Sequence, residues 1–116
     1  MFQELQSGSG GSSTSDSGSF ALSTSSETIN IPVKIKATYI LMVAIKDSST
    51  VGTWGCKFNS DGSQNLIWFG DTYSGGRFML NNSAMTYARN SDNTITYYHA
   101  ASSYLGGTTV YWVACE

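Results

Sequence analysis

Short runs of β-forming residues, separated by clusters of Gly, Asn, Asp and Ser, fill most of this 116-residue sequence. The segment Asn59-Ser60-Asp61-Gly62 is typical of a hairpin turn, because the glycine that follows Asp accepts a positive φ. No window repeats apolar residues at helical spacing over the length of a helix. The pattern therefore predicts an all-β fold, an antiparallel β-sandwich or jelly roll of eight or nine short strands.

The expected strands are separated by turn residues, and residues 20–116 are long enough for one domain of roughly a hundred residues. We expect them at Phe20–Ser23, Thr28–Lys34, Ala37–Lys46, Val51–Asn59, Asn65–Phe69, Arg77–Asn81, Met85–Arg89, Thr94–His99 and Thr109–Cys115.

The strand expected at Ala37–Lys46 is apolar on both faces for most of its length. A strand of a two-sheet antiparallel sandwich normally has one face in water. An uncovered apolar face would invite aggregation, so the second face needs a cover from loops or from another subunit. We expect Ile40, Met42 and Ala44 to form an oligomer seam on that face.

Two N-terminal segments precede the domain and differ from it in composition. Residues 1–6 form a short mixed peptide, and Ser and Gly make up most of residues 7–19. A Ser/Gly chain behaves as a flexible coil. We therefore interpret residues 7–19 as a tether and residues 1–6 as an anchor peptide that attaches the domain to a partner.

The composition indicates burial of surface against a partner and argues against nucleic acid. Charged residues make up 12% of the chain, aromatic residues make up 13%, and the net charge is −2. A chain with few charges and many aromatics tends to bury surface against a partner or against its own copies. The six basic residues are scattered along the sequence, whereas a phosphate-tracking surface needs a basic stripe.

The sequence has neither a recognisable signal peptide nor an apolar run long enough for a membrane span, so we expect cytoplasmic synthesis and no membrane insertion. Cys56 and Cys115 are far apart and lack the His partners of a metal site. Two buried free thiols are the interpretation that we favour, and a single disulfide between them stays open.

We expect no enzyme activity, no metal and no cofactor. The single histidine, His99, follows two tyrosines and is interpreted as an edge histidine beside aromatics, since no nucleophile or carboxylate arrangement accompanies it. Four aspartates lie in expected turns, where an Asx hydrogen bond explains them without a paired-carboxylate site: Asp47, Asp61, Asp71 and Asp92.

Aromatic side chains are the remaining candidates for ligand binding. A flat ring with a polar handle suits sugar stacking, although most strand aromatics fill a core or an oligomer interface. Tyr73 and Tyr104 lie in expected loops and are the candidate glycan contacts.

A short N-terminal peptide, a Ser/Gly spacer and a Tyr/Trp-rich β-domain that ends on its last strand together resemble small virion proteins of tailed bacteriophages. Head fibres, decoration proteins and tail-fibre tip domains are the similar types. The resemblance implies a non-enzymatic virion component, made in the bacterial host cytoplasm and assembled as a homotrimer. It also implies docking on a capsid or tail protein through residues 1–19, with Phe2 and Leu5 as anchors. A receptor-binding module for host-surface glycans is the alternative.

Overall fold

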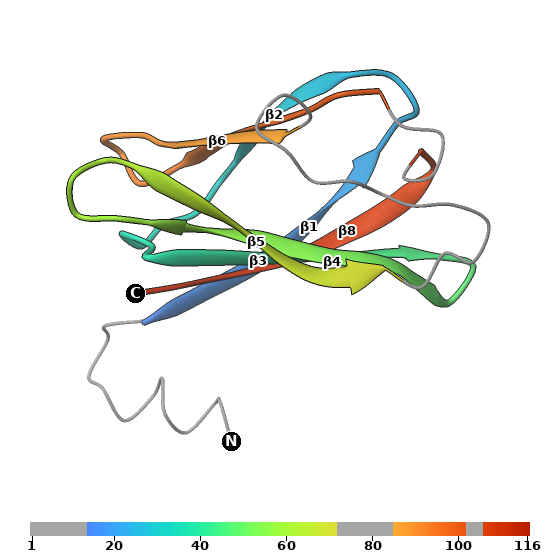
Figure 1. Cartoon of the computed structure of the whole chain (residues 1–116), viewed down its shortest axis with the longest axis horizontal. Coiled ribbons are helices and arrows are strands. Elements are labelled where there is room, and N and C mark those ends of the chain that lie inside the picture. Colours follow the sequence, from blue (N-terminus) through green and yellow to red (C-terminus); the bar gives the residue numbers. More distant parts are fainter. Residues whose placement is uncertain (1–13, 72–84, 102–105) are drawn as a thin grey trace.

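The computed structural model describes residues 14–71, 85–101 and 106–116, which form eight strands in two antiparallel sheets. The five-stranded sheet has the order β1 (Ser15–Leu22), β8 (Thr108–Cys115), β3 (Tyr39–Lys46), β4 (Ser49–Phe58) and β5 (Gln64–Asp71). The three-stranded sheet has the order β2 (Glu27–Ile31), β7 (Ile95–His99) and β6 (Met85–Arg89). Figure 1 shows the smaller sheet packed over one face of the larger one. The prediction of an all-β antiparallel sandwich is confirmed.

The core lies between the two sheets and is built from large side chains on their facing sides. Trp54 from the five-stranded sheet and Tyr97 and Ile95 from the three-stranded sheet are fully buried. Burial alternates along β3, so its even-numbered residues point into the core and its odd-numbered residues point outward.

This alternation corrects the expected oligomer seam. Ile40, Met42 and Ala44 are each 0% exposed within a single chain. In the ladder between β3 and β8, Met42 lies opposite Trp112, and both side chains belong to the buried core. The three-stranded sheet of the same chain, rather than another subunit, therefore covers this face. The seam prediction chose the wrong face of this strand.

The expected boundary between tether and domain is also wrong, because β1 begins at Ser15 rather than at Phe20. Its ladder with β8 runs without a break from the Ser15–Cys115 pair to the Leu22–Thr108 pair. Gly18 has a packing role in this strand, since a Cβ there would come within 2.7 Å of the Trp112 indole. The Ser/Gly composition of residues 15–19 thus belongs to an edge strand.

The two sheets carry matching hairpin turns, Asn59–Ser63 between β4 and β5 and Asn90–Thr94 between β6 and β7. In each turn the backbone N–H of the first Asn donates to the carbonyl of the residue four positions later, and its carbonyl accepts from the N–H three positions later. In each, the Asp carboxylate accepts bonds from the backbone N–H and the hydroxyl of the residue two positions later. A positive φ falls on the residue after the Asp, Gly62 in one turn and Asn93 in the other.

The segment that joins β2 to β3 carries the chain from the smaller sheet to the larger one. The predicted strand at Thr28–Lys34 ends earlier, at Ile31, because Pro32 cannot donate to the ladder. Beyond it, Val33, Ile35 and Ala37 are buried, whereas Lys34 and Lys36 are exposed. The predicted strand at Arg77–Asn81 lies outside the described residues.

Candidate functional site: an apolar sheet face and a basic pocket

The five-stranded sheet has apolar side chains on the side that points away from the smaller sheet. Five side chains from three adjacent strands line a shallow hollow of about 470 Å³ on it: Leu41, Val43, Thr53, Tyr111 and Val113. Tyr111 is 53% exposed and Val113 is 49% exposed. Among the described residues, no charged side chain lines this hollow, so this part of the sheet presents an uncharged, mainly apolar surface to solvent. We call these five residues the outer face.

The solvent side of the three-stranded sheet is different in character. Its exposed positions include Thr28, Asn30 and Thr86, which suit a face in water. The two solvent-facing sides of one sandwich are therefore unequal, one polar and one apolar. This asymmetry is the pattern expected where one face meets a partner.

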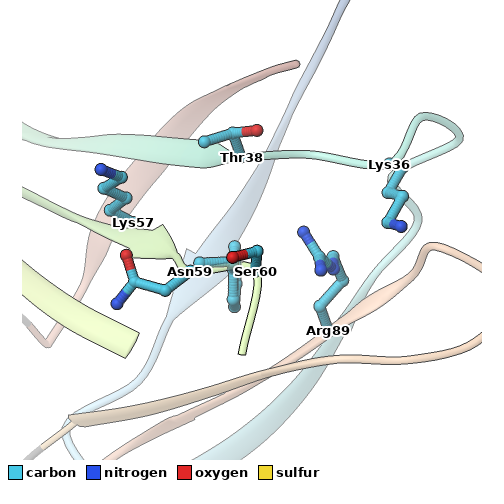
Figure 2. Close-up of a pocket in the computed structure, with 7 residues that line it drawn as sticks. Lys36, Thr38, Lys57, Asn59, Ser60 and Arg89 are labelled. Carbon is cyan, nitrogen blue, oxygen red and sulfur yellow. The ribbon is translucent and has the colours of Figure 1, made fainter. Parts of the chain in front are cut away.

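A second feature is a basic pocket of about 440 Å³ at one end of the sandwich. Its lining comes from the segment between β2 and β3, from the end of β4 and its turn, and from the end of β6. Figure 2 shows Lys36 and Arg89 toward one side and Lys57 toward the other, with Asn59 and Ser60 between them. The described residues that line it are Lys36, Thr38, Lys57, Phe58, Asn59, Ser60 and Arg89.

Two of the three cations are held by contacts with neighbouring residues. Nη1 of Arg89 donates a hydrogen bond to the backbone carbonyl of Ala37, and the guanidinium lies 5.3 Å from the centre of the Phe58 ring. Nζ of Lys57 lies 5.9 Å from the centre of the Tyr39 ring. Cation–π contacts of this kind favour a fixed position of the charge over the ring.

In the two matching turns, each Asp carboxylate accepts hydrogen bonds from within its own turn. Hydrogen bonds from Ser63 lower the pKa of Asp61, and hydrogen bonds from Thr94 lower the pKa of Asp92. Both aspartates are exposed, yet each accepts bonds from its own turn rather than pairing with a pocket cation.

Sequence reasoning missed this pocket. Lys36, Lys57 and Arg89 are far apart in the sequence, where the basic residues look scattered. The structure gathers these three because their strand ends meet at one end of the sandwich. The two matching turn motifs could have indicated the pocket, because each directly follows the end of a strand that carries a basic residue, Lys57 or Arg89.

His99 lies in the middle strand of the smaller sheet and is 1% exposed, so the interpretation as an edge histidine is wrong. Its Nδ1 lies 2.6 Å from the Tyr97 hydroxyl, which accepts a hydrogen bond of 3.2 Å from Nε1 of Trp54. Because the indole N–H can only donate, the Tyr97 proton is available to Nδ1. Burial lowers the pKa of His99 to about 4, although the nearby Glu27 carboxylate opposes the shift.

Cys56 and Cys115 are both free thiols, which resolves the alternative that the sequence left open. Cys56 is buried in the core, and this burial raises the pKa of its thiol to about 12. Cys115 is partly exposed near the end of β8. A thiol with so high a pKa stays protonated and packs as a small apolar side chain.

Within residues 14–71, 85–101 and 106–116, no group of three or more His, Cys, Asp or Glu residues has an arrangement that could hold a metal ion. That same part of the chain has no helix long and apolar enough to cross a membrane. The predicted anchors Phe2 and Leu5 and the predicted glycan contacts Tyr73 and Tyr104 lie outside the described residues.

Comparison with known proteins adds no relative: no protein-family model, no curated protein and no solved structure matches this chain.

Proposed function

We propose that this chain is a non-enzymatic attachment protein whose β-sandwich associates with copies of itself through the outer face. The apolar character of that face is the observation that carries the proposal. Tyr111 and Val113 on β8 are about half exposed, and none of the described residues that line the hollow is charged. Exposed contiguous apolar surface on a sheet marks a site of association.

The dimensions of the sheet support a second copy as the occupant. Strands of eight residues are about 26 Å long, and five strands spaced about 4.8 Å apart span about 19 Å. Two such faces stacked on one another would bury about 1,000 Å² in total, which reaches the lower limit of a specific interface. The hollow itself also suits stacking, because none of the five side chains described as lining it carries a charge that burial would leave unpaired.

The resemblance to small virion proteins of tailed bacteriophages gives this assembly a role. In that role residues 1–6 attach to a capsid or tail protein, and the associated β-domains project outward. The described part of the N-terminal region begins at the same end of the five-stranded sheet as the C-terminus, since the backbone N–H of Glu116 bonds to the carbonyl of Thr14. An anchor extending from there leaves the opposite end of the sandwich free.

A Val113→Glu substitution tests the self-association. The new carboxylate would be buried without a partner in the interface but would stay in water in a single chain, so we expect association to weaken at least tenfold while the melting temperature changes little. Sedimentation equilibrium measures both the affinity and the number of copies. Stacking through the outer face alone gives two copies, and the homotrimer that the resemblance implies would need a further contact between chains.

The matched control is Thr86→Glu, because Thr86 is an exposed position on the polar side of the other sheet. This variant introduces the same charge and should associate as the unmodified chain does. A purely monomeric unmodified chain at on the order of 100 μM would overturn the proposal, since that affinity is weaker than a specific interface provides.

Glycan binding through Tyr73 and Tyr104 is the alternative function. Both residues lie outside the described part of the chain, so it stays a prediction from the sequence alone.

A further inference from the structure

The basic pocket has a charge imbalance that neither the fold nor the outer face explains. The chain carries a net charge of −2, yet three of its six basic residues, Lys36, Lys57 and Arg89, line one pocket. Within the described part of the chain, no carboxylate forms an ion pair with any of these three. Gathering like charges costs free energy unless an anion offsets them.

The guanidinium of Arg89 is already positioned for a ligand. Its bond to the Ala37 carbonyl uses one N–H donor, and the Phe58 ring supports one face of the group. An Arg side chain has five donors, so others stay available for a bidentate contact with a carboxylate or phosphate. Because the side chain is held in place before binding, less conformational entropy is lost on binding.

The remaining lining residues are suited to hydrogen bonds with the hydroxyl groups of a ligand. Nδ2 of Asn59 donates to the Ser63 hydroxyl within its own turn and to the Asn65 side-chain oxygen in β5, which leaves the Asn59 amide oxygen as an acceptor. The hydroxyls of Thr38 and Ser60 lie in the same lining. A volume of about 440 Å³ is within the range of small-molecule sites.

We propose that this pocket binds an acidic sugar, with its carboxylate between Lys36 and Arg89 and its hydroxyls on Asn59, Ser60 and Thr38. Lys57, on the other side of the pocket, adds to the positive potential that attracts the anion (Figure 2). This site shares no residue with the outer face, so it does not depend on self-association of the chain.

Isothermal titration of the full chain with glucuronate, glucose and inorganic phosphate tests the proposal. We expect glucuronate to bind more tightly than either of the others, because only glucuronate combines the anionic group with the hydroxylated body. Added sodium chloride should weaken its binding, since the pocket charges are open to solvent. Phosphate binding as tight as that of glucuronate would show that the sugar body contributes nothing and would overturn the proposal.

Lys36→Gln supplies the residue-level test, because Lys36 is exposed and its loss leaves the core untouched. Loss of one charge-assisted contact should weaken glucuronate binding about tenfold. Lys34→Gln is the matched control, since Lys34 is exposed on the same segment but outside the lining, and it should bind as the unmodified chain does. Equal losses in the two variants, or no saturation by on the order of 10 mM glucuronate, would overturn the proposal.

Discussion

His99 makes the stability of the sandwich depend on pH at the scale of a single residue. Its folded pKa of about 4 lies below the ordinary value of 6.5, because burial disfavours the charged ring. Between these two values the unfolded chain binds a proton that the folded chain does not. The free energy of unfolding therefore falls as pH drops from 6.5 to about 4, by at most about 1.4 kcal/mol per pH unit, and this contribution is constant above and below that window.

Chemical denaturation at a series of pH values measures this dependence, with His99→Gln as the comparison. Glutamine retains polar groups near Tyr97 but does not titrate, so the variant should lose the slope even if it is less stable throughout. Asp61 and Asp92 have lowered pKa values and titrate below the window, which keeps their contribution separate. The interpretation fails if the variant keeps the full slope between pH 6.5 and 4.

Residue identity alone could not predict the basic pocket or the correct face of β3. Both faces of β3 are apolar, and the register with β8 decides which of them is inside, by placing Met42 opposite Trp112. Similarly, the three pocket cations have no common signal in the sequence, since only the meeting of separate strand ends brings them together. These features depend on contacts between distant segments, which a local pattern does not encode.

At the scale of elements, Gly55 sets the close approach of β3 and β4. A Cβ on Gly55 would meet the backbone carbonyl of Ile40, and it would come within 2.9 Å of the Leu41 side chain. The backbone oxygen belongs to a paired strand and cannot move aside without disturbing the ladder. We expect Gly55→Ala to reduce the free energy of unfolding by about 1–3 kcal/mol, as measured by urea denaturation.

Thr53→Ala is a suitable comparison for Gly55→Ala, because Thr53 lies two residues away on the same strand and is only partly buried. It removes atoms instead of adding them, and its cost should stay below about 1 kcal/mol. A loss for Gly55→Ala no larger than that for Thr53→Ala would show that β3 and β4 move apart without cost.

The elements themselves were largely predictable wherever β-forming residues alternate with turn residues. The predicted strand at Met85–Arg89 has the observed bounds, and the turn predicted at Asn59-Ser60-Asp61-Gly62 is present with a positive φ at Gly62. The start of β1 was not predictable from propensity, because Ser and Gly are weak strand formers. Pairing with β8 makes a strand of these residues, and the Trp112 ring needs a glycine beside it.

At the scale of the whole molecule, the sandwich separates two surfaces of opposite character. The outer face lies on one broad side of the five-stranded sheet, and the basic pocket lies at an end where both sheets contribute. If the chain associates through one surface and binds a ligand through another, the assembly carries several linked binding sites. Once one site is bound, the others meet a multivalent ligand at high effective concentration, so the overall affinity rises. An associated set of weak acidic-sugar sites would thus bind a polymer of acidic sugars more strongly than one chain does, at the same end of the sandwich as the N-terminal attachment.

Two N-terminal truncations separate attachment from folding across the whole chain. Deletion of residues 1–13 keeps every described contact, so we expect the melting temperature to stay the same while attachment to the phage particle of the proposed role is lost.

Deletion of residues 1–19 also removes five ladder positions against β8, the packing of Gly18 on Trp112, and the hydrogen bond from the Lys34 backbone to Asp16. Several lost hydrogen bonds should lower its melting temperature by at least about 10 °C. Calorimetry and co-sedimentation with particles measure the two effects. Equal melting temperatures would mean that residues 15–19 act as a tether after all, and attachment of the shorter deletion would place the anchor elsewhere.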